Sequence, residues 1–434
     1  MLSALLLAGL TLQSIDLGAE VHQVRVVDLD NDGFEDIVAV TAKELFIFRG
    51  TKHGLRKQPV TRIAAPAVTV VGKGLCGFVI DGYYHAVPDP MGDASKRGPA
   101  GARCLLGALG AGLPALLDSP GDVDGDGIDD AVLPDLDGFH VNGKLVPIPP
   151  RSTIEIRRNE TFAIKYEIAV PVAGNWSGAG SELVFFEDKQ ILVYKGPKLV
   201  ERIALHDEEA GAKAAALRRT QILIADVDGD GRLDLLITPS WGKAGIFASF
   251  DTHAWLWLKG RVWNKEKNGL YPPASAIKVA GALIRPDLLD VDSDGDLDLV
   301  LCTIDMGVIG LATGSAPGLY QVYLFDGKRF NAPAAWTYKG RIGPDALMNL
   351  DPQPPVTFLP DLDGDGRPEA VERGNGVRLL VGDGEGKLVQ AAKLDVQLNT
   401  GSKPDGTSLG RVRSGKQLAA IPARTGIVFV EVAR

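Results

Sequence analysis

A nine-residue acidic motif, D-x-D-x-D-G-x-x-[DE], occurs five times along the chain and limits the folds that are open to it. The copies are DLDNDGFED from Asp28, DVDGDGIDD from Asp122, DVDGDGRLD from Asp226, DVDSDGDLD from Asp290 and DLDGDGRPE from Asp361. A short apolar run precedes each copy and another follows it, as QILIA and LLIT do around the Asp226 copy. The repeating unit is therefore a strand, an acidic loop and a second strand.

Three further units keep this plan without the acids, around Thr69, around Gly174 and in the tail from Ser408. A typical unit continues with two more strands, as LFIFRG and PVTRI do in the first. Short antiparallel strands repeated in groups of four around an axis are typical of a β-propeller. We predict an all-β fold, a β-propeller of seven or eight four-stranded blades, with eight favoured. The tail unit lacks a strand, which the N-terminal LTLQSIDL is expected to supply, closing the ring.

The acidic loops carry the hard oxygen donors that Ca²⁺ prefers. Carboxylates stand at positions one, three, five and nine, position seven can add a backbone carbonyl, and the glycine at position six allows the positive φ that bends the loop. The predicted ligands are Asp28, Asp30, Asp32, Phe34 and Asp36; Asp122, Asp124, Asp126, Ile128 and Asp130; Asp226, Asp228, Asp230, Arg232 and Asp234; Asp290, Asp292, Asp294, Asp296 and Asp298; and Asp361, Asp363, Asp365, Arg367 and Glu369. We expect up to five structural Ca²⁺ ions.

Two alternative motifs fit the loops less well. An Asx-rich turn without metal needs one or two such residues rather than four acids. An EF-hand fits the Asp361 loop, where Glu372 falls at the twelfth position, but it requires a helix on each side. The flanks VTFLP and AVERGNGVRLLVG have the pattern of strands and turns. Calcium in a hairpin loop is therefore the favoured interpretation.

Charge and the N-terminus indicate where such a protein would work. The net charge of −9 argues against a nucleic-acid partner, and five divalent ions would bring it close to zero. Residues 1–10 include an apolar stretch of signal-peptide length, with an N-terminal strand as the alternative, and residues 11–434 are assigned to the propeller. Since millimolar Ca²⁺ exists outside cells, we expect an exported protein that is extracellular, at the cell surface or periplasmic. Cys76 and Cys104 are either disulfide-bonded or buried free thiols.

With these residues in view, the chain resembles the FG-GAP and VCBS repeat proteins, whose best-known member is the integrin α-subunit head. The resemblance covers about residues 11–434 and rests on the five loop motifs. It implies a calcium-binding propeller that acts in adhesion, and it places the family's calcium ligands on the acids named above. The integrin FG-GAP signature itself is missing, so an integrin-type ligand does not follow.

The remaining motifs favour binding over catalysis. Gly72–Gly77 matches a dinucleotide fingerprint and Gly406–Gly410 a nucleophile elbow, but neither is followed by a helical pattern, so we expect no catalytic and no cofactor-binding residues. Trp255, Trp257, Trp263 and Tyr271 could stack on sugars or pack a blade, with packing favoured. We therefore expect a monomeric binding or adhesion module for a protein or glycan, not an enzyme. The alternatives are a lectin or a polysaccharide lyase or hydrolase on the same scaffold, and a purely structural repeat protein.

Overall fold

The computed structural model describes residues 9–81, 83–93, 96–102, 104, 114–141, 144–148, 151–156, 162–167, 171–187, 190–205, 217–243, 249–260, 262–264, 269–305, 316–342, 354–374, 376–398, 401–402, 408–409 and 413–432. Strands, turns and bends make up this part of the chain, and it contains no helix. The chain divides into two units. Unit 1 comprises residues 1–26, 51–57 and 207–434, and unit 2 comprises residues 27–50 and 58–206.

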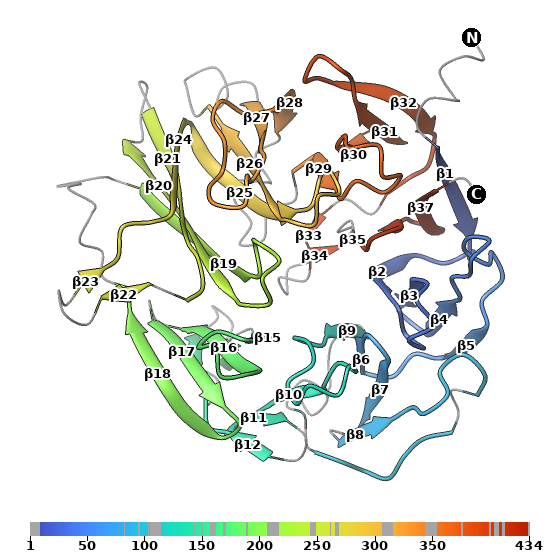
Figure 1. Cartoon of the computed structure of the whole chain (residues 1–434). Coiled ribbons are helices and arrows are strands. Elements are labelled where there is room, and N and C mark those ends of the chain that lie inside the picture. Colours follow the sequence, from blue (N-terminus) through green and yellow to red (C-terminus); the bar gives the residue numbers. More distant parts are fainter. Residues whose placement is uncertain are drawn as a thin grey trace. The chain divides into compact units, whose positions relative to one another are not determined.

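Unit 1 holds four sheets of four antiparallel strands each, blades 5 to 8 (Figure 1). Blade 5 consists of β19 (Leu217–Ala225), β20 (Asp234–Lys243), β21 (Ser249–Trp257) and β24 (Ser275–Ala280). Blade 6 consists of β25 (Ala282–Leu289), β26 (Asp298–Ile304), β27 (Ala316–Tyr323) and β28 (Trp336–Ile342). Blade 7 consists of β29 (Val356–Leu359), β30 (Glu369–Gly374), β31 (Gly376–Gly382) and β32 (Leu388–Leu394).

Blade 8 is assembled from both ends of the chain. Its strands are β35 (Arg413–Ser414), β36 (Leu418–Pro422), β37 (Gly426–Val432) and the N-terminal β1 (Leu10–Asp16). The antiparallel pairing of β1 with β37 runs from Leu10 opposite Val432 to Asp16 opposite Gly426. The predicted closure by LTLQSIDL is therefore confirmed. The signal peptide expected at residues 1–10 falls almost entirely outside the described residues and stays a prediction.

Unit 2 holds blades 2 to 4 and most of blade 1. Blade 1 consists of β2 (Val21–Val27), β3 (Asp36–Thr41), β4 (Glu44–Phe48) and β5 (Thr61–Ala64). Blade 2 contains β6 (Val68–Gly72), β7 (Leu75–Ile80), β8 (Tyr83–Ala86) and β9 (Ala115–Asp118), and blade 3 contains β10 (Val132–Asp135), β11 (Gly138–Val141) and β12 (Lys144–Val146). Blade 4 consists of β15 (Pro171–Gly174), β16 (Glu182–Glu187), β17 (Gln190–Lys195) and β18 (Lys198–Ala204).

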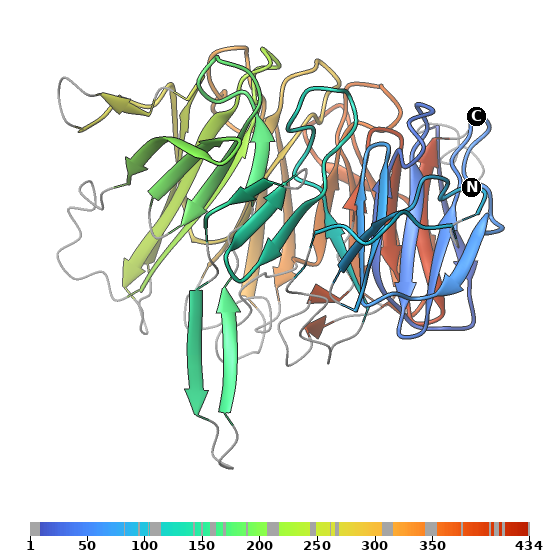
Figure 2. The same ribbon diagram turned by 90° about the horizontal axis from the view of Figure 1, so that it is seen from below.

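Three short hairpins are separate from the blade sheets. They are β13 (Arg151–Ile156) with β14 (Phe162–Glu167), β22 (Trp263–Asn264) with β23 (Gly269–Leu270), and β33 (Gly401–Ser402) with β34 (Ser408–Leu409). The first of these is the longest and projects from unit 2 (Figure 2). None of the three was predicted from the sequence.

The fold is an eight-bladed β-propeller, as favoured from the sequence. One strand departs from the predicted pattern. β9 precedes the Asp122 loop, where the first strand of blade 3 was expected, but it pairs in parallel with β6 of blade 2. Pro120 in the loop and Pro134 in β10 lack the N–H groups that would extend an antiparallel ladder between β9 and β10.

The core lies between consecutive blades. In blade 5, β24 alternates strictly between buried and exposed residues. Its buried residues Ile277 and Val279 pack in one cluster with Leu299 and Leu301 of blade 6. The opposite face of blade 6 packs in the same way on blade 7. Each loop between the first two strands of a blade is thereby held at the end of a rigid, two-sided packed sheet.

Candidate metal centres

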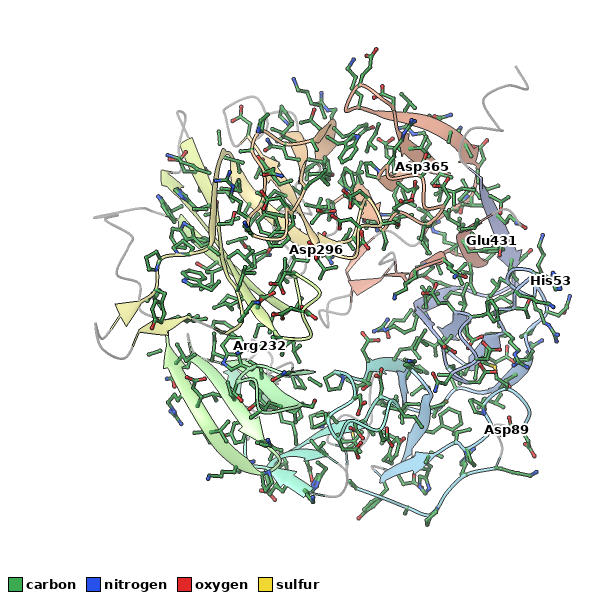
Figure 3. The ribbon with its side chains drawn as sticks, viewed as in Figure 1. His53, Asp89, Arg232, Asp296, Asp365 and Glu431 are labelled. Atoms are coloured by element: carbon green, nitrogen blue, oxygen red, sulfur yellow. The ribbon has the colours of Figure 1, made fainter. Side chains whose placement is uncertain are left out.

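Each of the five acidic loops brings carboxylate oxygens together. In every loop, one oxygen from each member of a group lies within 4.8 Å of those of the others. The groups are Asp28, Asp30 and Asp32; Asp122, Asp124 and Asp130; Asp226, Asp228 and Asp230; Asp290, Asp292 and Asp294; and Asp361, Asp363, Asp365 and Glu369. Figure 3 labels Arg232, Asp296 and Asp365, one residue from the loop of each of three consecutive blades of unit 1. Positions one and three converge in all five loops.

The local fold of each loop follows from its first aspartate. Asp28 accepts hydrogen bonds from the backbone N–H groups of Asp32 (3.0 Å) and Gly33 (2.9 Å). Gly33 has a φ of 87°, a conformation that residues with a Cβ rarely adopt. The same bond to position six is made by Asp122, Asp226, Asp290 and Asp361. The first aspartate therefore shapes the turn around the acids that follow it.

The carboxylate at position nine is tied to the backbone. Asp36 is fully buried and accepts hydrogen bonds from the N–H groups of Leu29 (2.9 Å) and Gly50 (2.8 Å). Asp298 accepts from Val291 (3.0 Å) and Phe325 (2.8 Å) in the same manner. Asp36, Asp234 and Asp298 are outside the converging groups, whereas Asp130 and the longer Glu369 belong to theirs. The role of the first three as calcium ligands stays a prediction, and their observed role is to clamp the loop.

Two further side chains of the acidic loops also lie outside the converging groups. Asp126 is outside the converging group of its loop and accepts a hydrogen bond from the N–H of Ile128 (2.9 Å). Asp296 is also outside its group, and its pKa is raised mainly by burial and by Asp294. The carbonyl donors expected at position seven, Phe34, Ile128, Arg232, Asp296 and Arg367, stay predictions.

Basic side chains accompany some loops, a feature that was not predicted from the sequence. Arg49 Nη2 lies 2.8 Å from a carboxylate oxygen of Asp30 and 2.9 Å from one of Asp32. Lys259 Nζ lies 2.7 Å from Asp230 and 3.9 Å from Asp228. The signal lies in the residues that follow the third strand, FRG in blade 1 and LKG in blade 5. These two loops therefore carry a protein cation beside their acids.

Unsatisfied oxygens test whether the loops fit a metal ion. In the blade 6 loop, Oδ1 of Asp290 and Oδ1 of Asp292 are both buried and lack a hydrogen-bond partner. Buried carboxylate oxygens without a partner carry a high free-energy cost, which a bound cation would remove. Only oxygen donors converge there, as a hard cation such as Ca²⁺ requires. The residues of this loop fit a calcium ion.

The pKa values of several loop carboxyl groups are shifted in this crowded, partly buried setting. Burial raises the pKa of Asp36 and of Asp298 to about 7, with two backbone N–H donors acting in the opposite direction. Burial also raises the pKa of Glu369 to about 9 and that of Asp363 to about 6. By contrast, the hydrogen bond from Lys259 lowers the pKa of Asp230. Without a cation, these groups are held together against their mutual repulsion.

Neighbouring loops of unit 1 are joined through their backbones. The N–H of Leu297 donates to the carbonyl of Val227 (2.8 Å), linking the loops of blades 6 and 5. The N–H of Asp361 donates to the carbonyl of Asp290 (3.0 Å), linking the loops of blades 7 and 6. The three acidic loops are thus fixed relative to one another.

The aromatic residues of blade 5 form a cluster on one face of β20 and β21. Trp257 is 3% exposed, and its Nε1 donates to the carbonyl of Tyr271 (2.7 Å), so the packing interpretation is confirmed for it. The Trp255 ring lies 6.5 Å from that of Trp257 and 6.2 Å from that of Trp241, while Trp241 stacks on His253 at 4.6 Å. Trp255 is partly exposed.

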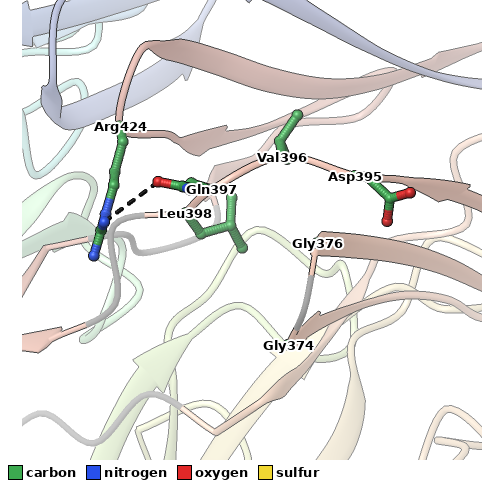
Figure 4. Close-up of a pocket in the computed structure, with 7 residues that line it drawn as sticks. All are labelled: Gly374, Gly376, Asp395, Val396, Gln397, Leu398 and Arg424. Carbon is green, nitrogen blue, oxygen red and sulfur yellow. Dashed lines mark hydrogen bonds between the residues drawn. The ribbon is translucent and has the colours of Figure 1, made fainter.

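A surface groove of about 470 Å³ lies between the ends of strands in blades 7 and 8 (Figure 4). Arg424 Nη1 donates to Oε1 of Gln397 at one end (3.3 Å), and Asp395 pairs with Lys393 (2.7 Å) at the other. Asp395 is the one carboxylate among the described residues that line this groove, whereas hydrolysis of a glycosidic bond ordinarily needs two. The two discounted motifs also gain nothing from the structure. Gly72–Gly77 joins strands β6 and β7, and Ser408 begins β34. Cys76, Cys104 and Cys302 are buried thiols that form no disulfide in the described part of the chain.

No family model matches the chain, and no curated protein matches it either. Among solved structures it is similar to the crystal structure of BBS1N in complex with ARL6DN, soaked with mercury, at 11% identity and a TM-score of 0.39 over 98% of this chain and 97% of that chain. It is also similar to the WD40 domain of SCAP from fission yeast, at 7% identity and a TM-score of 0.35 over 98% and 99%. Because both scores are low, the propeller assignment rests on the strand order, and the FG-GAP/VCBS family is not shown.

Proposed function

We propose that this chain is a calcium-stabilised β-propeller that serves as a binding module rather than an enzyme. The observation that carries the proposal is the convergence of carboxylate oxygens in five loops, with two buried, unpartnered oxygens in the blade 6 loop. Repulsion among such groups costs roughly 1 kcal/mol per pair in water and more near a protein surface. A divalent cation offsets that cost and ties together the strands on both sides of each loop.

The carboxylates of each loop would have two roles, binding the ion and holding the backbone. Carboxylates at positions one, three and five, with Asp130 and Glu369, would bind the ion, and Ca²⁺ would supply only charge and coordination there. The ninth residues Asp36, Asp234 and Asp298 would keep the strands paired whether or not the ion is bound, because they hold backbone N–H groups. In the described part of the chain, no ion pair joins an Arg or Lys to the converging acids of the blade 6 loop, whereas Arg367 Nε lies 3.9 Å from Asp365 in the blade 7 loop. We expect the blade 6 loop to depend most on calcium.

A location outside the cytosol follows from this chemistry. Extracellular calcium modules bind Ca²⁺ with dissociation constants of about 0.1 to 1 mM, and such Ca²⁺ concentrations exist outside cells and not in the cytosol. We therefore place the protein outside the cell, at its surface or in the periplasm. No helix in the described residues is long and apolar enough to cross a membrane.

Binding to a protein is the role that the scaffold favours. Rigid, closely packed sheets hold their connecting loops in fixed positions, an arrangement suited to recognition surfaces. A glycan-binding role is the second candidate, because Trp241, His253 and Trp255 place aromatic rings beside one another on blade 5. A polysaccharide-active enzyme is a weaker alternative, since the acids that could serve as catalysts are concentrated in the five loops.

Thermal unfolding tests the calcium proposal. The melting temperature is measured in about 2 mM Ca²⁺ and in excess chelator, with about 2 mM Mg²⁺ as a control. We expect a rise of several degrees with Ca²⁺ and a much smaller one with Mg²⁺, which demands stricter octahedral geometry. Equal melting temperatures in all three solutions would overturn the proposal.

Glycan-array binding decides between the binding roles. If the aromatic cluster is a sugar platform, the wild-type protein binds specific glycans and Trp255→Ala abolishes that binding. The matched control is Trp176→Phe, which changes a buried tryptophan of blade 4 outside the cluster. An empty array with the folded wild-type protein would leave a protein ligand as the conclusion.

A further inference from the structure

A tight turn in blade 2 lies between the acidic loops of blades 1 and 3, all within unit 2. It consists of Gly72–Gly74, joins β6 to β7, and is called the blade 2 turn below. A Cβ placed on Gly74 would lie 3.5 Å from Cβ of Asn31 in the blade 1 loop and 3.3 Å from Cγ2 of Ile128 in the blade 3 loop. The blade 2 turn therefore contacts both acidic loops at once, although it carries no acid of its own.

On the blade 1 side, the turn holds the residue that begins the acidic loop. The backbone N–H of Gly74 donates to the carbonyl of Asp28 (2.9 Å), whose carboxylate belongs to the converging group of that loop. Arg49 pairs with Oδ2 of Asp30 in this group, while Oδ1 of the same carboxylate is buried and has no hydrogen-bond partner in the described part of the chain. The blade 1 loop, like that of blade 6, therefore retains an oxygen that a cation would satisfy.

On the blade 3 side, the turn holds Asp129, the eighth residue of the acidic loop. The N–H of Lys73 donates to Oδ2 of Asp129 (2.8 Å), and the N–H of Asp129 donates to the carbonyl of Lys73 (2.9 Å). The next residue, Asp130, belongs to the converging group of this loop. Ser119 follows β9 and donates from Oγ to the carbonyl of Asp130 (2.7 Å) and from its N–H to the carbonyl of Val71 (2.8 Å). The pairing of β9 with β6 thus brings both ends of the blade 3 loop against blade 2 (Figure 1).

The turn has no free space on its blade 3 side. A Cβ placed on Gly72 would lie 2.7 Å from Cβ of Asp129 and 2.7 Å from Cβ of Ser119, closer than real Cβ atoms approach. Gly74 has a φ of 65°, which residues with a Cβ rarely adopt. Close packing and backbone conformation therefore account for the first two glycines of the Gly72–Gly77 motif. A displacement of either acidic loop must also displace this turn.

The same kind of contact joins two acidic loops in unit 1. There the N–H of Leu297, the eighth residue of the blade 6 loop, donates to the carbonyl of Val227 in the blade 5 loop (2.8 Å). The N–H of Asp129 makes the equivalent contact with Lys73. Blade 2 has thus kept the backbone link between neighbouring loops without the carboxylates.

We propose that the blade 2 turn couples calcium binding in the loops of blades 1 and 3, so that an ion in one loop raises the affinity of the other. The inference rests on the calcium binding proposed above. Without an ion, repulsion among the carboxylates opposes the converged form of each loop. An ion restores that form in one loop and fixes the group that the turn binds there, the carbonyl of Asp28 or the N–H of Asp129. The turn is then held in place, so the second loop loses less conformational freedom when its own ion binds.

Charge acts in the opposite direction. An ion in one loop makes the potential at the other loop less negative, which lowers its calcium affinity. Salt at about 0.15 M screens exposed charges beyond about 8 Å, whereas it does not remove a hydrogen-bonded contact. We therefore expect the coupling through the turn to prevail at physiological ionic strength.

Calorimetric calcium titration of the full chain tests the coupling once the loops of unit 1 are silenced. Asp228→Asn, Asp292→Asn and Asp363→Asn each replace a converging carboxylate there, which leaves the loops of blades 1 and 3. In this background, Asp124→Asn silences the blade 3 loop and Asp30→Asn the blade 1 loop. We expect each to weaken calcium binding by the remaining loop about fivefold, with the same factor in both directions, because coupling free energies are reciprocal. Calcium binding with unchanged affinities would overturn this inference alone, whereas no calcium binding by the wild type would overturn the proposed function as well.

Variants of Asp129 decide whether the turn carries the coupling. Asp129→Ala removes the acceptor of the Lys73 N–H, so the factor should fall to about twofold or less. Asp129→Asn keeps an acceptor oxygen and should retain most of the factor, which separates the hydrogen bond from the charge. The matched control is Asp137→Ala, which removes an exposed carboxylate from the turn between β10 and β11 of the same blade. An undiminished factor in Asp129→Ala would overturn the assignment of the coupling to this turn.

Amide hydrogen exchange keeps the test valid if Asp129→Ala disturbs the blade 3 loop. In the Asp124→Asn variant of the silenced background, calcium binds in the blade 1 loop. It should nevertheless slow exchange of the Asp129 N–H severalfold, because that group donates to the turn. The N–H of Leu136, which donates to Asp135 in the β10–β11 turn, should exchange at the same rate with and without calcium. An unchanged rate at Asp129 while calcium occupies the blade 1 loop would contradict the coupling.

Discussion

The acidic loops of blades 5 and 6 share a motif and a backbone framework, but they balance their charge differently. Asp234 and Asp298 both accept hydrogen bonds from position two of their loop and from a residue just after the third strand. That last residue is Lys259 in blade 5 and Phe325 in blade 6. Lys259 reaches back to Asp230, whereas Phe325 is buried against Phe330, with ring centroids 5.5 Å apart.

This single difference changes the electrostatics of the loop. In blade 5, the hydrogen bond from Lys259 lowers the pKa of Asp230. In blade 6, burial and the neighbouring Asp294 raise the pKa of Asp292, and its Oδ1 has no partner. One loop therefore carries its own cation, and in the function proposed above the other would take one from solution. The two loops share the turn that their motif forms, and they differ in a residue distant in sequence, which is Lys259 in one and Phe325 in the other.

The largest effect on the free energy of unfolding is expected from replacing the ninth carboxylate, which both loops share. Asp298→Ala and Asp234→Ala each leave two backbone N–H groups without their acceptor, which costs about 2 to 4 kcal/mol of the free energy of unfolding. We expect this loss in calcium and in chelator alike, measured by urea denaturation. Asp298→Asn keeps one acceptor oxygen and should lose less. A loss confined to calcium-containing buffer would show instead that the ninth carboxylate acts mainly as a ligand.

The second prediction concerns how much calcium-dependent stability each of the two loops contributes. At about 1 mM Ca²⁺ and a dissociation constant of about 0.1 mM, a filled site stabilises the fold by about 1.4 kcal/mol. Asp292→Asn should remove most of this calcium-dependent part, and Asp228→Asn less than half as much, because Lys259 already neutralises its loop. The measurement is the difference between unfolding free energies with calcium and with chelator. Equal losses in the two variants would remove the distinction between the loops.

Much of the fold could be predicted because local sequence patterns determine it. The apolar runs around four of the five acidic motifs predicted the paired strands, and the missing strand of the tail predicted the pairing of β1 with β37. The sequence did not predict that β9 pairs with blade 2 instead of blade 3. That pairing depends on which backbone N–H groups remain available next to Pro120 and Pro134, since proline has none. The β13–β14 hairpin was missed because it lies outside the repeat.

The candidate sites were predicted in composition but not in geometry. Asp28, Asp30 and Asp32 converge as expected, since alternate residues of a tight loop point inward. Asp36 looks equivalent in sequence, yet buried backbone N–H groups of Leu29 and Gly50 compete for it. The sequence does not reveal that competition, because Gly50 reaches Asp36 only after β3 and β4 have paired.

The smallest and most specific effect is expected from Lys259→Met, which keeps the aliphatic stem and removes the charge. The ammonium group and Ca²⁺ compete for Asp230, so we expect the calcium affinity of the blade 5 loop to rise severalfold, measured by calorimetric titration. In chelator the variant should be less stable than the wild type, and calcium should narrow that gap. Lys278→Met is the matched control, because Lys278 pairs with Asp251 (2.9 Å) in the same blade but outside the loop. Since that pair is surface-exposed and touches no candidate ligand, its loss should leave calcium affinity unchanged. Equal calcium affinity in Lys259→Met and the wild type would mean that the lysine and the ion do not share a site, and the difference between blades 5 and 6 would then lie in the loops themselves.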